Sequence, residues 1–231
     1  MGQGPVLAES RALTLPSTPV GSHQQNSTHK GPQMAHIDYY FATISPFTYL
    51  AGPEFEAIAK KHGATVTYKP LDIMGLFSAT GGVPPGQRHI NRQEYRLQDM
   101  RRRAIVTGLP FTMKPAHWPT NMAPSSYAII AAQNEGGDVG ALVNALTRSC
   151  WADDKNIADE DVIRACLEET GFDPELVNSG MLEGADAYAR NLEEAVAKGV
   201  FGAPFFISDK DERFWGQDRL DDLDRHLSGE F

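Results

Sequence analysis

Residues 36–50 have the sequence "HIDYYFATISPFTYL", in which two different periodicities meet. The first half is rich in aromatic and β-branched residues that alternate between two faces, which predicts a β-strand. From Pro46 to His62 the apolar residues follow helical spacing, and Gly63 then ends the helix. Ser45 stands at the junction, directly before the proline that opens the helix.

Further along the chain, the same two periodicities recur in a distinctive order. "ATVTYKPL" at 64–71 alternates and predicts a second strand, so the chain begins with a β-α-β unit, for which a parallel, right-handed crossover is expected. Near the end, "FFIS" at 205–208 and "RFWG" at 213–216 predict two strands joined by a turn, followed by a helix over 217–227.

The part between these two ends is helical in its spacing, with Gly, Asn and Asp at the joints. Helices are expected at 92–107, 123–134, 138–151, 158–170, 173–180 and 182–198. The order βαβ, helical block, ββα predicts an α/β protein with a thioredoxin-like fold and an inserted all-helical domain. We place the thioredoxin-like domain at 34–72 and 199–231, and the helical insertion domain at 73–198.

Residues 1–33 differ in composition from the rest of the chain. They are rich in Gly, Pro, Ser, Thr and Gln, and they contain no aromatic residue and no periodic pattern. Such a segment has too little apolar surface to order itself. We therefore expect a disordered leader, or a leader foreign to a natural protein that begins at Met34.

Charge and composition exclude several classes of function. The net charge of −9 argues against binding to nucleic acid or to an anionic membrane. No apolar stretch approaches the roughly 20 residues of a membrane span. Cys150 and Cys166 lack C-x-x-C spacing, so buried helix positions and a reducing, cytoplasmic compartment are expected. The histidines lack helical i, i+4 ligand spacing, so we predict no metal.

Ser45 has two possible roles. A serine directly before a helix-opening proline is usually a cap, which accepts a hydrogen bond from a free backbone N–H of the first turn. The same free N–H groups and the positive end of the helix dipole can also stabilise a thiolate. Because Ser45-Pro46-Phe47-Thr48 contains no cysteine, any working thiol at this point must come from a cofactor.

Two further stretches are predicted to lie at the same edge of the sheet. Ala203-Pro204 is either an ordinary turn or, in a thioredoxin fold, a cis-proline whose preceding residue pairs with an extended peptide through its backbone. Gln217 and Asp218 are either a helix cap or a rim that binds an ammonium group. Together with Ser45, these positions suit a small peptide that carries a thiol and an α-amino end, as glutathione does.

The sequence resembles the 2-hydroxychromene-2-carboxylate isomerases and the kappa-class glutathione transferases, which are DsbA-like thioredoxin-fold proteins. The resemblance extends from about Ile37 to Leu227. It rests on the order and spacing of "SPFTYLAG" at 45–52, "GVPPGQ" at 82–87, "WPTN" at 118–121, "CWADDKNIADEDVI" at 150–163, "GVFGAPFFI" at 199–207 and "FWGQDRLDDL" at 214–223.

The resemblance implies a role for each site residue. Ser45 would lie beside the glutathione sulfur, and Ala203, followed by the cis Pro204, would pair with the cysteinyl backbone. Gln217 and Asp218 would hold the γ-glutamyl end. Arg92 falls near a family lysine that contacts the glycyl carboxylate.

The function implied is a glutathione-dependent isomerase whose small aromatic substrate contains a conjugated enone. Trp118, Tyr49 and Phe77 are candidate flat walls for that substrate, although aromatic residues such as these are more often plain core. A homodimer is also implied by the resemblance. Three alternatives stay open: a glutathione transferase or peroxidase, a DsbA-type disulfide oxidoreductase, which the missing cysteine disfavours, and a non-catalytic glutathione-binding protein.

Overall fold

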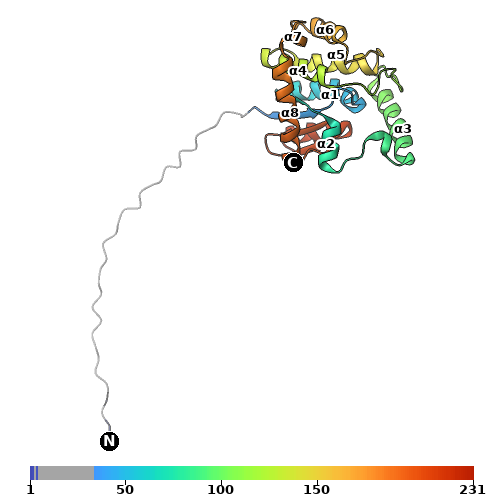
Figure 1. Cartoon of the computed structure of the whole chain (residues 1–231). Coiled ribbons are helices and arrows are strands. Elements are labelled where there is room, and N and C mark those ends of the chain that lie inside the picture. The colour runs from blue at the N-terminus through green and yellow to red at the C-terminus, as the bar shows by residue number, and fades with distance from the viewer. Residues whose placement is uncertain (3, 5–33) are drawn as a thin grey trace. The chain divides into compact units, whose positions relative to one another are not determined.

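The computed structural model describes residues 1, 2, 4 and 34–231 (Figure 1). Apart from residues 1, 2 and 4, the expectations for the 1–33 segment therefore lie outside the described residues. Residues Met34–Phe231 form one compact unit, and it is this unit that is described below. The proposed division into 34–72 with 199–231 and 73–198 stays a prediction.

A four-stranded mixed sheet lies at the centre of the unit, in the order β2-β1-β3-β4. Its strands are β1 (His36–Phe41), β2 (Thr65–Pro70), β3 (Phe205–Ser208) and β4 (Arg213–Trp215). β1 runs parallel to β2 and antiparallel to β3, so that Tyr39 stands between Tyr68 and Phe206. The predicted β-α-β unit and the closing pair of strands are both present.

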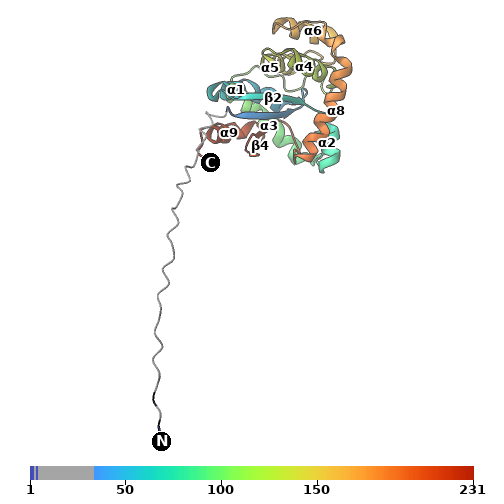
Figure 2. The ribbon, with the colours of Figure 1, turned by 90° about the vertical axis from the view of Figure 1, so that its left-hand side faces the viewer.

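Helices surround this sheet (Figure 2). None of the helices in the described part of the chain is long and apolar enough to cross a bilayer. In chain order they are α1 (Pro46–His62), α2 (Ile73–Thr80), the 3-10 turn η1 (Pro85–Gln87), α3 (Ile90–Thr107), α4 (Ala123–Glu135), α5 (Val139–Trp151), α6 (Glu160–Glu169), α7 (Leu176–Ser179), α8 (Met181–Ala197), the 3-10 turn η2 (Gln217–Arg219) and α9 (Leu220–Leu227).

Alternation along β1 divides the core into two clusters, one on each face of the sheet. Tyr39 and its neighbours on that face pack with residues of α1, α4, α5 and α9. The ring of Tyr39 lies 4.7 Å from that of Phe55 and 4.8 Å from that of Phe206, between centroids. Tyr40 points the other way, into a cluster with residues of α2, α8 and the end of α5. Both faces are therefore covered, which explains why β1 carries apolar residues at neighbouring positions, such as Tyr39 and Tyr40, that point to opposite faces.

The helix α2 was not expected from the sequence, from which no element was predicted between the second strand and the helix at 92–107. Both of its ends carry ordinary signals. The side chain of Asp72 accepts a hydrogen bond from the backbone N–H of Met74 at 2.9 Å, and Gly81 ends the helix with a left-handed φ of 77°. With eight residues, α2 is too short to show a clear helical period.

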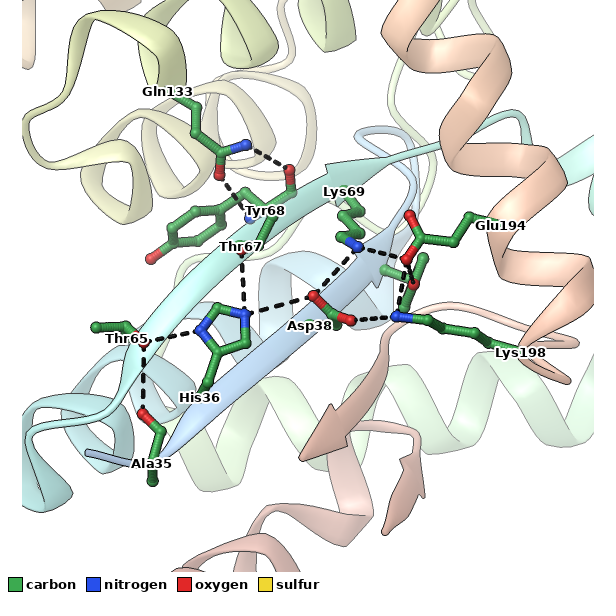
Figure 3. A network of polar contacts seen from close by, with 11 residues as sticks. Ala35, His36, Asp38, Thr65, Thr67, Tyr68, Lys69, Gln133, Glu194 and Lys198 are labelled. Carbon is green, nitrogen blue, oxygen red and sulfur yellow. Dashed lines mark hydrogen bonds and ion pairs between the residues drawn. The ribbon is translucent and has the colours of Figure 1, made fainter. Parts of the chain in front are cut away.

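An ion network ties α8 to the sheet (Figure 3). Asp38 on β1 receives Lys69 Nζ at 3.1 Å on one carboxylate oxygen and Lys198 Nζ at 2.6 Å on the other. Glu194 on α8 lies 2.7 Å from Lys69 Nζ and accepts a hydrogen bond from the Tyr40 hydroxyl at 3.1 Å. Burial alone would raise the pKa of Asp38, but the two lysines outweigh it and hold that pKa below its usual range.

Candidate functional site

Ser45 is the N-cap of α1, and the hydrogen bond that it makes as a cap is long. Its backbone is extended, with φ −79° and ψ 125°, and its Oγ accepts from the backbone N–H of Thr48 at 3.4 Å. Backbone hydrogen bonds are usually 2.7–3.2 Å long, so this contact is at the weak end of the range. The side chain is half-buried at the positive end of a 17-residue helix. Capping and the orientation of an anion are both compatible with this geometry.

The Ala203–Pro204 peptide bond is cis, as the sequence predicted. Its position relative to Ser45 follows from the sheet. Because β1 and β3 are antiparallel with Tyr40 opposite Phe205, the chain leaving β1 and the chain entering β3 meet at one edge. Ser45 and Ala203 thus belong to the same edge of the sheet.

Gln217 and Asp218 lie close to this edge of the sheet. The residue before them, Gly216, donates its backbone N–H to the Pro204 carbonyl at 2.9 Å. Gln217 is buried, and η2 contacts α1. Asp218 is exposed, and its carboxylate lies 3.6 Å from the guanidinium of Arg219. The expectation that Asp218 caps the last helix is wrong. It lies inside the 3-10 turn, and α9 begins only at Leu220, without a side-chain cap.

The first turns of α3 bring basic side chains to the site. Arg92 is exposed, near the start of the helix. One turn further, the guanidinium carbon of Arg96 lies 5.5 Å from the ring centroid of Phe47 and 5.8 Å from that of Trp118. Burial, followed by the charge of Arg88, lowers the pKa of Arg96 to about 10, so the side chain stays charged at neutral pH.

Sequence reasoning did not single out Arg96. The i, i+4 spacing of Arg92 and Arg96 was a visible signal that these two cations share one side of the helix. Its two aromatic partners come from other parts of the chain, so they could not be predicted from the local sequence of α3.

The three candidate aromatic walls have different surroundings. Trp118 donates its indole N–H to the Ile44 carbonyl at 2.9 Å, so its ring is fixed next to Ser45, and its peptide bond to Pro119 is cis, which the sequence did not predict. Tyr49 is buried and donates its hydroxyl to the Pro110 carbonyl at 2.8 Å, as a core residue does. Phe77 lies 5.8 Å beneath the guanidinium of Arg88.

The protein's own thiols are buried and poorly ionisable. Cys150 and Cys166 are free and buried. Burial, with a smaller contribution from Asp154, raises the pKa of Cys150 to about 12, and burial also raises the pKa of Cys166. Neither cysteine occupies the start of α1, where Ser45 stands.

Comparison with known proteins identifies the family. The model of the DSBA-like thioredoxin domain matches residues 36–228. A 2-hydroxychromene-2-carboxylate isomerase of Sphingobium xenophagum is 34% identical over 197 residues, which cover 83% of this chain and 97% of that protein. The chain therefore belongs to the DsbA-like thioredoxin family and, within it, to the family of the 2-hydroxychromene-2-carboxylate isomerases. The family resemblance and the isomerase class expected from the sequence are thereby confirmed.

Two more distant comparisons extend this result. Glutathione S-transferase kappa 1 of Caenorhabditis elegans is 25% identical over 204 residues, which cover 82% of this chain and 89% of that protein. A solved structure of a 2-hydroxychromene-2-carboxylate isomerase superposes with a TM-score of 0.70 at 24% identity and covers 84% of this chain and 95% of its own. The thioredoxin-like α/β fold predicted from the sequence is thereby confirmed.

Proposed function

We propose that this protein is a glutathione-dependent isomerase of a small aromatic acid of the 2-hydroxychromene-2-carboxylate type. The observation that carries the proposal is the edge of the sheet where the start of α1 and the cis-proline loop meet, with a serine in place of a reactive cysteine. The family relatives named as isomerases support the reaction class.

The polar groups that we assign to this site match the polar groups of glutathione. The backbone of Ala203, before the cis Pro204, suits pairing with an extended peptide. Asp218 offers an exposed carboxylate to an α-amino group, and Gln217 lies beside it in the same turn. Arg92, exposed in the first turn of α3, is suited to the glycyl carboxylate. The related kappa-class transferase supports a thiol of this kind.

Bound glutathione would supply a thiolate that adds reversibly to a conjugated enone, so that the former double bond can rotate before the thiol leaves. The protein's part is to hold that sulfur as an anion. A free thiol with a pKa near 8.5 is only a few per cent ionised at neutral pH, and lowering the pKa by about one unit raises the ionised fraction severalfold. The Ser45 hydroxyl and the positive end of α1 are placed to provide this shift.

A kappa-like transferase or peroxidase activity is the second candidate, favoured by the 25% identity to glutathione S-transferase kappa 1. It would use the same thiolate, but the sulfur would stay on the product or become oxidised. The two candidates are separated by the fate of the thiol, which an isomerase returns unchanged.

The test is turnover of 2-hydroxychromene-2-carboxylate, followed by absorbance, with and without glutathione. We expect interconversion with the open-chain benzylidenepyruvate isomer that requires glutathione and consumes none of it. Loss of free thiol in step with turnover would favour the transferase. Binding of glutathione without turnover of this substrate or of a standard transferase substrate would indicate a non-catalytic binding protein.

We further propose that the protein works in the reducing cytoplasm and forms a homodimer through the 73–198 segment. Both cysteines are free. On α3, the apolar side chains of Ile90, Tyr95, Ile105 and Val106 are 56–74% exposed, and a dimer interface on this helix would cover them. Light scattering measures the mass directly, and a monomer at micromolar concentration would contradict the dimer.

A further inference from the structure

Arg96 is a cation without an anion. Among the residues that the structure describes, no carboxylate lies within ion-pair distance of it, and the charged group that affects it most is another cation, Arg88. Arg88, itself half-buried, donates to the Val83 carbonyl at 2.7 Å, whereas two other half-buried arginines have carboxylate partners. Arg103, two turns further along α3, pairs with Glu54, and Arg164 pairs with Glu160 at 2.7 Å.

The position of Arg96 is fixed by two rings. Phe47 and Trp118 lie within 6 Å of its guanidinium carbon, a distance at which an aromatic face attracts a cation. These rings offset part of the cost of burying the charge, but they accept no hydrogen bonds in the plane of the guanidinium. The N–H groups of that plane therefore stay available to an oxyanion.

Both rings are positioned by the backbone next to Ser45. Phe47 is the second residue of α1, and the Trp118 indole donates to the carbonyl of Ile44, the residue before Ser45. An anion held by Arg96 would thus lie next to the start of α1, where the proposed function places the reacting sulfur.

We propose that Arg96 binds the carboxylate of the aromatic acid on which the protein acts, and that it thereby selects acids over neutral enones. This inference rests on the proposed function for the identity of the substrate. A guanidinium flanked by aromatic faces presents its planar fork to a carboxylate, which is the geometry of bidentate recognition. Arg92, one turn away and exposed, stays the candidate for the glycyl carboxylate of glutathione.

The test measures binding rather than turnover, so that it stands even if the isomerase activity is not found. Calorimetry with trans-cinnamate, a planar aromatic acid, is compared with its uncharged methyl ester and, separately, with glutathione. We expect Arg96→Gln to weaken trans-cinnamate about tenfold or more, because a charged hydrogen-bond donor is lost, and to leave the ester and glutathione within about twofold.

Two variants complete the design. Arg96→Lys keeps the charge but loses the planar fork, so we expect it to recover only part of the affinity for trans-cinnamate. Arg101→Gln is the matched control, because Arg101 is an exposed arginine of the same helix, and no change is expected. Thermal melts establish that each variant is folded, and Arg96→Lys carries the test if Arg96→Gln does not fold.

Three results would overturn the assignment. One is a wild-type protein that binds trans-cinnamate no better than its ester. Another is an equal loss of acid and ester in Arg96→Gln, which would make Arg96 a packing residue. The third is a loss confined to glutathione, which would place Arg96 in the cofactor pocket. If turnover is found, Arg96→Gln should also raise KM for the aromatic acid and leave KM for glutathione unchanged.

Discussion

Two groups of partly buried charges in this molecule differ in one respect. In the network of Asp38, Lys69, Lys198 and Glu194, each charge faces an opposite charge at 3.1 Å or less. At the start of α1, Arg96 lies close to the rings of Phe47 and Trp118, and within residues 34–231 no carboxylate is in ion-pair distance of it. The first group joins β1, β2 and α8, and the second lies where the ligand is proposed to bind.

The difference separates charges that stabilise the fold from charges that serve binding. A buried charge with no partner is costly, and a protein that needed only stability would gain by pairing it or replacing it with an apolar residue. Changes in the network should therefore affect unfolding and leave chemistry intact, and changes at the start of α1 should do the reverse. Four predictions test this contrast.

The largest effect is expected at Ser45. Ser45→Ala should cut turnover about ten- to a thousandfold, the range for losing one donor directed at a developing charge. It should cost no more than about 1 kcal/mol of unfolding free energy, because the cap bond is long. Steady-state kinetics and thermal melts measure the two effects, and the thiolate absorbance of bound glutathione should titrate at higher pH in the variant.

A matched control comes from another cap. Asp159 caps α6 and accepts from the Asp161 N–H at 3.0 Å. Asp159→Ala should lower stability at least as much as Ser45→Ala, because its cap bond is shorter, and leave turnover unchanged. If Ser45→Ala behaves in the same way, with an unchanged thiol titration, Ser45 is a cap and nothing more.

The next effect is expected at Asp38. Asp38→Asn removes the carboxylate shared by Lys69 and Lys198 and should cost about 2 kcal/mol of unfolding free energy at pH 7, with turnover unchanged. Because the folded-state pKa of Asp38 is lowered, its stabilisation is fully present above the ordinary value of 3.8 and is lost as the pH falls through the lower folded-state value. The difference between the two proteins should therefore shrink below about pH 4.

Denaturant melts at pH 7 and pH 3 provide the comparison. Asp211→Asn is the control, since Asp211 pairs with Arg213 on the surface and should contribute almost nothing. A difference for Asp38→Asn that stayed constant with pH would show that shape, and not charge, is responsible.

An effect with the opposite pH dependence is expected at Glu56. Burial, partly opposed by hydrogen bonds from the Tyr68 hydroxyl and reinforced by Asp138, raises the pKa of Glu56 to about 7. A carboxyl group whose pKa is raised on folding stabilises below its unfolded value, and this stability is lost as the pH rises through the folded value. The wild type should lose about 3 kcal/mol between pH 4.5 and pH 8 from this group, and Glu56→Gln should remove that loss.

Melting temperatures across this pH range measure the effect. The variant should be as stable as the wild type or less so near pH 5, where Glu56 is protonated, and relatively more stable near pH 8. Parallel pH profiles for the two proteins would show that Glu56 titrates normally.

The smallest effect is expected for residues 1–33. Deletion of this segment should change neither the melting temperature nor turnover, because its composition offers little apolar surface for packing. Both quantities are measured on the same preparation, and a clear loss of either would show that the segment packs on the folded unit.

The local sequence pattern was sufficient to predict an element where that element is long and its ends carry clear residues such as proline or glycine. The bounds of α1 follow from Pro46 and Gly63, and the two faces of β1 follow from its alternation. The prediction of a cis bond before Pro204 rested on the thioredoxin-like fold that the order of elements implied. α2 was missed because eight residues show too little period, and Asp218 was misplaced because a 3-10 turn precedes α9.

The remainder of the site depends on contacts between distant parts of the chain. Arg96 is distinguished by its contacts with Phe47, from α1, and Trp118, from the loop before α4. The i, i+4 spacing of Arg92 and Arg96 puts both on one side of α3, but only the packing of α1 against α3 shows which of them lies near the two rings.

The burial of both cysteines has a practical consequence for covalent labelling. Thiol-directed alkylating reagents react with exposed thiolates, and Cys150 and Cys166 are neither exposed nor readily ionised. A cysteine placed at position 45 would thus be the single addressable thiol of the folded protein, next to the proposed ligand. One residue change would convert the native sequence into a scaffold for attaching a probe at its proposed reaction centre, with no need to remove any cysteine first.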